Sequence, residues 1–277
     1  MLFRSEIAQF GSERRQFMPI GETPKLMRDA LLSAEDFRFY QHFGIDLRGL
    51  ARAGLAMVTG GMRQGASTIT QQVARTFFLS PRITVERKLK EALLSLQIEQ
   101  RLDKDHILEL YMNQIYLGQR AYGFAAASQV YFGKPLASLS VAEVAMLAGL
   151  PQNPNYANPI TNFERARTRQ RIVLKMMLDR GVITQAQWAQ AREQVLRIRT
   201  PNGGGELHAE YVAEMARRVV VERFGTDVYS QGIRVVTSVR STDQAAAWTA
   251  LRRGLLDHDR KQAWRGPEDQ ESLPDNL

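Results

Sequence analysis

The feature that most constrains the fold is an apolar helical pattern that ends in two adjacent carboxylates. Apolar residues between Leu26 and Ala34 recur at spacings of three and four, and Thr23 and Pro24 suit the start of a helix. Glu35 lies at the edge of this apolar stripe, where burial disfavours a charged carboxylate and raises its pKa. Such a carboxylate can serve as a general base near neutral pH. A solvated pair of acids at a helix end is the other interpretation of the same residues.

The composition is that of a basic globular protein. The 277 residues, 44% hydrophobic and 24% charged, suffice for one large domain, or for one domain and part of another. The net charge of +8 favours an anionic partner such as nucleic acid, anionic lipid or a phosphorylated substrate. The absence of cysteine excludes disulfides and thiolate zinc sites. No apolar run is long enough for a complete transmembrane helix, and no signal peptide is expected.

Helical signals continue along most of the chain. Asp46 is expected to cap a helix through about Val58, whose apolar and basic residues fit either the core or a membrane surface. In the helix expected after Thr84, Leu89, Leu93 and Leu96 should face the core. Further helix starts are predicted at Ser67, Asp105, Ser140 with Glu143 as a capping box, Phe163, and Thr184 with Gln187.

The composition changes near Pro201, and the glycines at 203–205 indicate a linker. A helix is expected over 208–224, and the alternation from Ile233 to Val239 predicts a strand before a last helix that starts at Asp243. We therefore expect one domain over residues 1–200. Residues 201–277 would then hold a linker and the incomplete start of a second module.

Two polar stretches between these helices can be interpreted either as ordinary structural features or as parts of a functional site. Residues 65–72 crowd hydroxyls and amides at a helix start, which suits a polyhydroxylated or phosphorylated ligand, or else an elaborate cap with a polar face. Arg87 and Glu91 are four residues apart and can pair, with Lys88 and Lys90 beside them. A solvated charged face is the alternative for this second stretch.

Four motifs follow one another in the first half of the chain. They are Glu-Asp-x-x-Phe-x-x-His-x-Gly at 35–44, Gly-x-Ser-Thr-Ile-Thr-Gln-Gln at 65–72, Arg-Lys-x-x-Glu at 87–91 and Lys-x-x-Ile-Leu-x-x-Tyr-x-Asn-x-x-Tyr-x-Gly at 104–118. In this order they resemble the family 51 peptidoglycan glycosyltransferases, which form a domain of class A penicillin-binding proteins. A fifth motif, Arg-Arg-x-x-Val-Leu, is partial, because Gln170 follows Arg169 where that family has a second arginine. The resemblance covers roughly residues 5 to 200.

The resemblance implies a mainly α, lysozyme-like glycosyltransferase domain, followed here by a short α/β segment. It also implies lipid II as substrate, polymerised with inversion into a β-1,4-linked glycan strand while polyprenyl pyrophosphate is released. Pyrophosphate is already a good leaving group, so the reaction needs a base for the attacking hydroxyl and cations for the departing charge.

The motif positions imply the site residues. Glu35 resembles the base, and Glu91 resembles a second required carboxylate. The expected substrate-binding residues are Asp36, Phe39, His42, Arg52, Ser67, Thr68, Thr70, Gln71, Gln72, Arg75, Arg87, Lys88, Lys90, Asn113 and Tyr116. Arg82 is a further candidate for the pyrophosphate. Glu91 would orient the basic residues or a metal, so metal ligands are left open, as is a divalent cation, Mg or Mn, as cofactor.

The expected partners are lipid II, the growing glycan strand, the membrane surface, phosphoglycolipid inhibitors and other cell-wall synthesis proteins. The expected location is the outer face of the cytoplasmic membrane in a bacterial envelope. One alternative keeps the fold but transfers to water, as in a lysozyme-like hydrolase or lytic enzyme; a hydrolase of glycan has no pyrophosphate to hold. Another is a basic nucleic-acid-binding module. The dispersed basic residues and the lack of a nucleic-acid motif argue against it.

Overall fold

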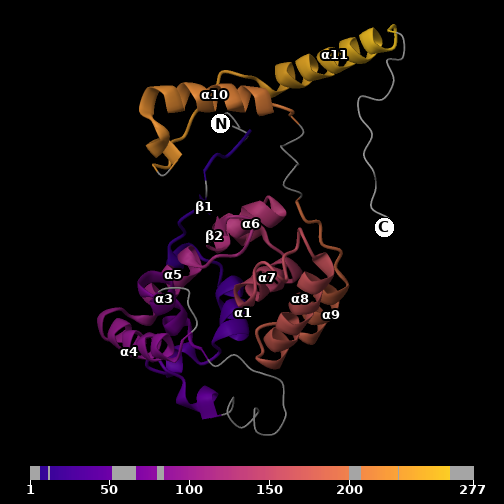
Figure 1. The fold of residues 1–277 in the computed structure, drawn as a ribbon. Coiled ribbons are helices and arrows are strands. Elements are labelled where there is room, and N and C mark those ends of the chain that lie inside the picture. Colours follow the sequence, from indigo (N-terminus) through magenta and orange to yellow (C-terminus); the bar gives the residue numbers. More distant parts are fainter. Residues whose placement is uncertain are drawn as a thin grey trace, which may run out of the picture. The chain divides into compact units, whose positions relative to one another are not determined.

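The computed structural model describes residues 7–11, 13–51, 67–79, 84–199, 207–229 and 231–262. The chain divides into two compact units, each described by itself below (Figure 1). The larger is Ser12–Pro201, and the smaller combines Met1–Gly11 with Asn202–Leu277. Within the described ranges, no helix is both long and apolar enough to cross a membrane.

The larger unit is mainly helical, which confirms the predicted fold class. Its described helices are α1 (Lys25–Glu35), α3 (Ile69–Phe78), α4 (Val85–Arg101), α5 (Lys104–Gln114), α6 (Phe124–Phe132), α7 (Val141–Gly149), α8 (Phe163–Asp179) and α9 (Gln185–Glu193). Short 3-10 turns are η1 (Ile20–Glu22), η2 (Phe39–Gln41), η3 (Leu136–Ser138) and η4 (Leu150–Gln152). Two short strands, β1 (Arg14–Arg15) and β2 (Ala121–Tyr122), pair in parallel with Arg14 opposite Ala121.

The core of this unit forms around α7, which is buried on nearly every side. Its alanines, Val144, Met146 and Leu147 are closed off from solvent, and α1 and α8 pack against it (Figure 1). A helix that is apolar all round belongs in the interior. On α1, Met27, Ala30 and Leu31 face this core and are fully buried. The last residue of α1, Glu35, is therefore held where the helix emerges from apolar packing.

Several predicted helix starts are confirmed and others move by one or two residues. The capping boxes of Ser140 with Glu143 and of Thr184 with Gln187 are present, and Thr84 caps α4. Asp46 accepts a hydrogen bond from the amide of Gly49 at 2.9 Å, and residues 47–51 are helical. The rest of the helix predicted through Val58 lies outside the described residues.

Three predicted caps are wrong. Thr68, not Ser67, caps α3, because its hydroxyl reaches the amide of Gln71 while the Gln71 side chain returns to the Thr68 amide. Asp103, not Asp105, caps α5. Thr23 does not cap α1, because its hydroxyl donates to the carbonyl of Pro19. For α3 and α5 a neighbouring side chain has the geometry that the cap requires, whereas the N-cap of α1 is Pro24, which makes no side-chain hydrogen bond to the helix.

The leucines of α4 do not face the core as predicted. Leu89 and Leu93 are 62% and 55% exposed, Leu96 is half-buried, and the fully buried residues of α4 are Glu91 and Ser95. Gly44 explains this orientation: a Cβ at Gly44 would lie 2.9 Å from the carbonyl carbon and oxygen of Ser95. The chain after η2 thus passes directly against the α4 backbone at Ser95, so the buried face of α4 is the one that carries Ser95.

The smaller unit contains α10 (Glu210–Phe224), η5 (Thr226–Tyr229) and α11 (Ser241–Asp259). The rings of His208 and Trp248 stack at 3.8 Å, and the side chain of Gln244 donates to the carbonyl of His208. The strand predicted from Ile233 to Val239 is wrong: these residues have no regular secondary structure. A strand needs a partner for its backbone groups, and no described segment pairs with this one.

Candidate active site

Glu35 stands at the C-terminal end of α1 in a half-buried position. Its Oε2 accepts a hydrogen bond of 2.9 Å from Nε2 of Gln72 on α3. Burial raises the pKa of the Glu35 carboxyl, and the neighbouring Asp36 adds a smaller effect in the same direction. The Gln72 donor and the charges of Arg169 and Arg75 oppose this shift without cancelling it. The expectation of a pKa-raised carboxylate is thus met by this geometry.

Two arginines from different helices hold their charges near Glu35. Arg75 lies one turn beyond Gln72 on α3, and Arg169 comes from α8. Burial lowers the pKa of Arg169, and the charge of Glu35 counteracts that effect. Arg169 was not among the predicted site residues, although it matches the first arginine of the fifth motif. That match was the only signal that could have identified it.

Asp36 and His42 connect the end of α1 to the start of α3. The Asp36 carboxylate accepts the amide of Ile69, the first residue of α3, at 3.0 Å, and His42 Nε2 lies 3.0 Å from both of its oxygens. Both side chains are more than nine-tenths buried. Their contacts are with the protein itself, so they position the helices that carry Glu35 and Gln72.

The hydroxyls and amides of residues 67–72 are used mostly inside the fold. Thr68 donates to the carbonyl of Gly44 at 2.6 Å, and Thr70 donates to Glu99, which also pairs with Lys104. Thr68, Thr70 and Gln71 are buried. Of the two interpretations of this stretch, the structure therefore favours a cap with internal partners over a surface offered to a ligand. Two side chains of this stretch contact charged groups of the site: Ser67 contacts Lys88, and Gln72 contacts Glu35.

Glu91 is the centre of a second cluster. Its carboxylate is fully buried and lies 2.7 Å from Lys88 Nζ and 3.3 Å from Arg87 Nη1. Lys88 also donates to Ser67 Oγ at 2.8 Å. The predicted pairing of Arg87 with Glu91 is present. Lys90, by contrast, pairs with Glu86 on the solvent side of α4.

The remaining predicted residues lie in the core or against other segments. Phe39 is fully buried beneath Lys104, whose Nζ is 4.4 Å from the ring centroid, so it offers no surface to a ligand. Asn113 exchanges hydrogen bonds with both backbone groups of Met18 and fixes the chain before α1. Tyr116 contacts Tyr122 and Asn155. Arg52 and Arg82 lie outside the described residues.

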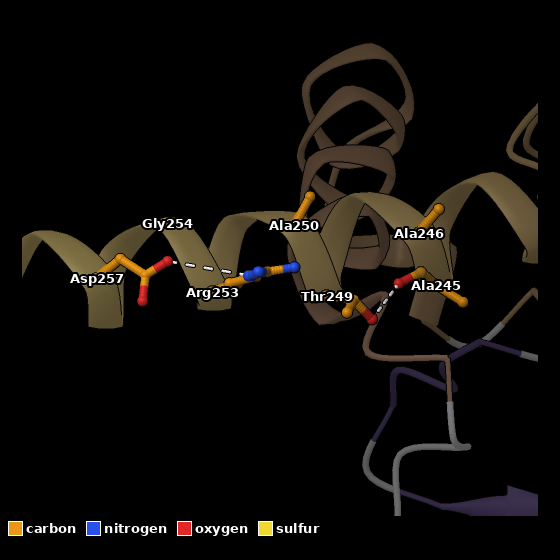
Figure 2. Close-up of a pocket in the computed structure, with 7 residues that line it drawn as sticks. All are labelled: Ala245, Ala246, Thr249, Ala250, Arg253, Gly254 and Asp257. Carbon is orange, nitrogen blue, oxygen red and sulfur yellow. Dashed lines mark hydrogen bonds and ion pairs between the residues drawn. The ribbon is translucent and has the colours of Figure 1, made fainter.

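The described residues also form two hollows, one in each unit. A cavity of about 500 Å³ lies beside η2, lined among others by Arg38, His42, Phe43 and Leu96. In the smaller unit, a hollow of about 660 Å³ runs along α11 alone, where Thr249 donates back to a helix carbonyl and Arg253 pairs with its neighbour Asp257 (Figure 2). Among the described residues, no group of three or more His, Asp or Glu could hold a metal ion.

Comparison with known proteins places the chain in a family. The family model described as Transglycosylase matches residues 4–178. Penicillin-binding protein 1A of Neisseria lactamica is 51% identical over 95% of this chain, and that of Pseudomonas aeruginosa is 46% identical over 95%. A crystal structure of penicillin-binding protein 1A from Haemophilus influenzae, 30% identical, superposes with a TM-score of 0.50 over 96% of this chain and 30% of its own.

The chain belongs to the transglycosylase family, as its four motifs indicated. It spans about a third of the length of the curated relatives, 33% for the Neisseria lactamica protein and 32% for the Pseudomonas aeruginosa protein. The mainly helical fold described above is thus that of a transglycosylase-family domain.

The raised pKa of Glu35 predicts how stability depends on pH. The folded protein binds this proton more tightly than the unfolded chain, in which the pKa is near 4.5. Wild type therefore loses stability as pH rises from that value through the folded-state pKa. We expect Glu35→Gln to melt above wild type at pH 8, with the difference disappearing toward pH 4, in thermal melts across that range.

Glu86→Gln is the matched control. Lys90 lowers the pKa of the exposed Glu86, so the ionised Glu86 stabilises the folded protein. The melting temperature of Glu86→Gln at pH 8 should therefore be at or below that of wild type, opposite to Glu35→Gln. A Glu35→Gln protein that melts at or below wild type across the whole pH range would contradict the burial account.

Proposed function

We propose that this domain polymerises lipid II into β-1,4-linked glycan strands and releases polyprenyl pyrophosphate, with Glu35 as the base. The observation that carries the proposal is the environment of Glu35: a half-buried carboxylate with a raised pKa, one amide donor and two arginine charges nearby. A carboxylate with a raised pKa is a stronger base than an ordinary carboxylate, so it can accept a proton from a hydroxyl near neutral pH.

The reaction follows from these roles. Glu35 takes the proton from the 4-hydroxyl of the acceptor GlcNAc as that oxygen bonds to C1 of the MurNAc at the reducing end of the growing chain. The C1–O bond to pyrophosphate breaks with its electron pair, and the configuration at C1 inverts. The leaving group departs as an anion, so cations rather than a general acid lower the barrier.

We assign the pyrophosphate contacts to two cations, one on α3 and one on α4. Arg75 on α3 is one, and Lys88, which reaches from α4 to Ser67, is the other. Glu91 is fully buried between Lys88 and Arg87, so we assign it the positioning of these cations. Buried charges in proteins need such partners. A hydrolase of finished glycan has no use for this arrangement, because its substrate lacks pyrophosphate.

The setting of the domain is also proposed. The polyprenyl tail of lipid II stays in the bilayer, so the site must work at the membrane surface, on the outer face of the cytoplasmic membrane in the cell envelope. We propose that the segment 47–62, which begins with the exposed Leu47 and Leu50, touches the membrane; its residues after 51 lie outside the described ranges. Phosphoglycolipid inhibitors and other cell-wall synthesis proteins are further proposed partners.

We retain the proposed division of the chain. Residues 1–200 would form the glycosyltransferase domain, and 201–277 a linker and the start of a second module.

The proposed activity is tested with labelled lipid II in mild detergent, by separating polymer and released lipid pyrophosphate from monomer. Wild type should form polymer, and Glu35→Gln should form it about 10²-fold more slowly or worse, because the amide cannot accept the proton. A folded Glu35→Gln protein with near-normal turnover excludes Glu35 as the base. Reducing ends released from purified glycan without any polymer would indicate a hydrolase instead.

Lys88 and Lys90 form a matched pair for testing the cation assignment. Both are on α4, but Lys88 contacts Ser67 and Glu91 whereas Lys90 pairs with Glu86 in solvent. We expect Lys88→Ala to weaken binding of a phosphoglycolipid inhibitor by about 10-fold or more, since it removes a charged contact. Lys90→Ala should bind like wild type. Equal affinities for the two variants, measured by fluorescence polarisation, would show that Lys88 is an ordinary surface charge.

A further inference from the structure

A chain of two hydrogen bonds leads from the core to Glu35. The hydroxyl of Tyr111 on α5 donates to Oε1 of Gln72 at 3.1 Å, and Nε2 of Gln72 donates to Glu35 at 2.9 Å. The three residues come from α5, α3 and α1, and α3 packs against both α4 and α5 (Figure 1). We propose that Tyr111 is a positioning residue that acts on Glu35 through the side-chain amide of Gln72. The inference rests on the proposed role of Glu35 as the base.

The amide of Gln72 has two ends with opposite chemistry. Rotation by half a turn exchanges its donor and its acceptor. An ionised Glu35 can only accept, so the donor end of Gln72 must face it and the acceptor end must face Tyr111. Both Gln72 and Tyr111 are buried, at 6% and 2% exposure. A phenol that donates to Oε1 therefore stabilises the one orientation in which Glu35 has a hydrogen-bond donor.

Removing the Tyr111 hydroxyl makes that orientation of the Gln72 amide unfavourable. Oε1 of Gln72 would become a buried acceptor without a donor, which is unfavourable. The amide would then turn away or withdraw, and the ionised form of Glu35 would lose its only side-chain donor among the described contacts. The carboxyl should then release its proton only at higher pH.

Other charges around Glu35 stay the same in such a variant. Asp36 follows it in the chain, Arg75 comes from α3 and Arg169 from α8. On α7, which packs against α1, the one charged residue is Glu143, and its carboxylate accepts a hydrogen bond from Lys134. Burial and the charge of Glu35 hold the pKa of Tyr111 well above its usual value, so the phenol keeps its proton throughout the pH range of the experiment.

The test measures the pKa of Glu35 directly, by infrared titration of its carboxyl band as a difference against Glu35→Gln. In Tyr111→Phe we expect this pKa to rise by about one unit, because a hydrogen bond to a charged group is lost. The acid limb of lipid II polymerisation should move to higher pH by the same amount, with kcat lowered on that limb and KM unchanged. Tyr131→Phe is the matched control, since it removes a buried hydroxyl that donates to Leu117 at 2.7 Å. It should leave both readouts at wild-type values.

A second variant tests the action of Tyr111 through Gln72 if Tyr111→Phe does not fold. Gln72→Met keeps the length of the side chain and removes both hydrogen bonds, so it should raise the pKa of Glu35 by itself. Adding Tyr111→Phe to Gln72→Met should cause no further rise, because Tyr111 acts through Gln72. An unchanged pKa of Glu35 in either folded single variant overturns the proposal, and so does a further rise in the double variant.

The same data separate this inference from the proposed function. If the pKa of Glu35 moves as expected while the acid limb of polymerisation stays in place, the action of Tyr111 through Gln72 is supported and Glu35 is not the base.

Discussion

The junction between the end of α1 and the start of α3 is the contact on which the site depends. Asp36, directly after the last residue of α1, accepts the first amide of α3, and His42 lies against both of its oxygens. A carboxylate at a helix N-terminus is stabilised by the unpaired amides and the helix dipole there. Because Glu35 precedes Asp36 and Gln72 lies within the first turn of α3, this single contact brings Glu35 and its hydrogen-bond donor together.

The residues at the start of α3 also link the contacts of Glu35 to those of Glu91. Ser67 contacts Lys88 beside Glu91, Thr68 binds the carbonyl of Gly44, and Gln72 contacts Glu35. Gly44 in turn allows the chain to pass against α4 at Ser95. Residues 67–72 therefore chiefly connect the contacts of Glu35 to those of Lys88 and Glu91.

Some local signals could be predicted from the sequence, although the caps of α3 and α5 were each misplaced by one or two residues, and tertiary partners could not. The capping boxes at Ser140 and Thr184 depend on residues three apart, so the sequence alone was sufficient. The partner of Thr68 is Gly44 and Arg169 acts on Glu35 from α8; both pairings depend on packing between distant segments. The apolar period of α4 revealed a stripe but not what it faces. The four motifs identified the family, and they matched positions such as Phe39 and Asn113 whose contacts are structural.

The central claim is that Asp36 holds the start of α3 against the end of α1, and amide hydrogen exchange tests it most directly. In Asp36→Ala, the amides of Ile69 and Gln71 should exchange much faster than in wild type, because the first turn of α3 loses its anchor. The amides of Val173 and Leu174 in the buried face of α8 should keep their protection, and polymerisation should fall. Unchanged protection of Ile69 together with normal polymerisation would contradict the account.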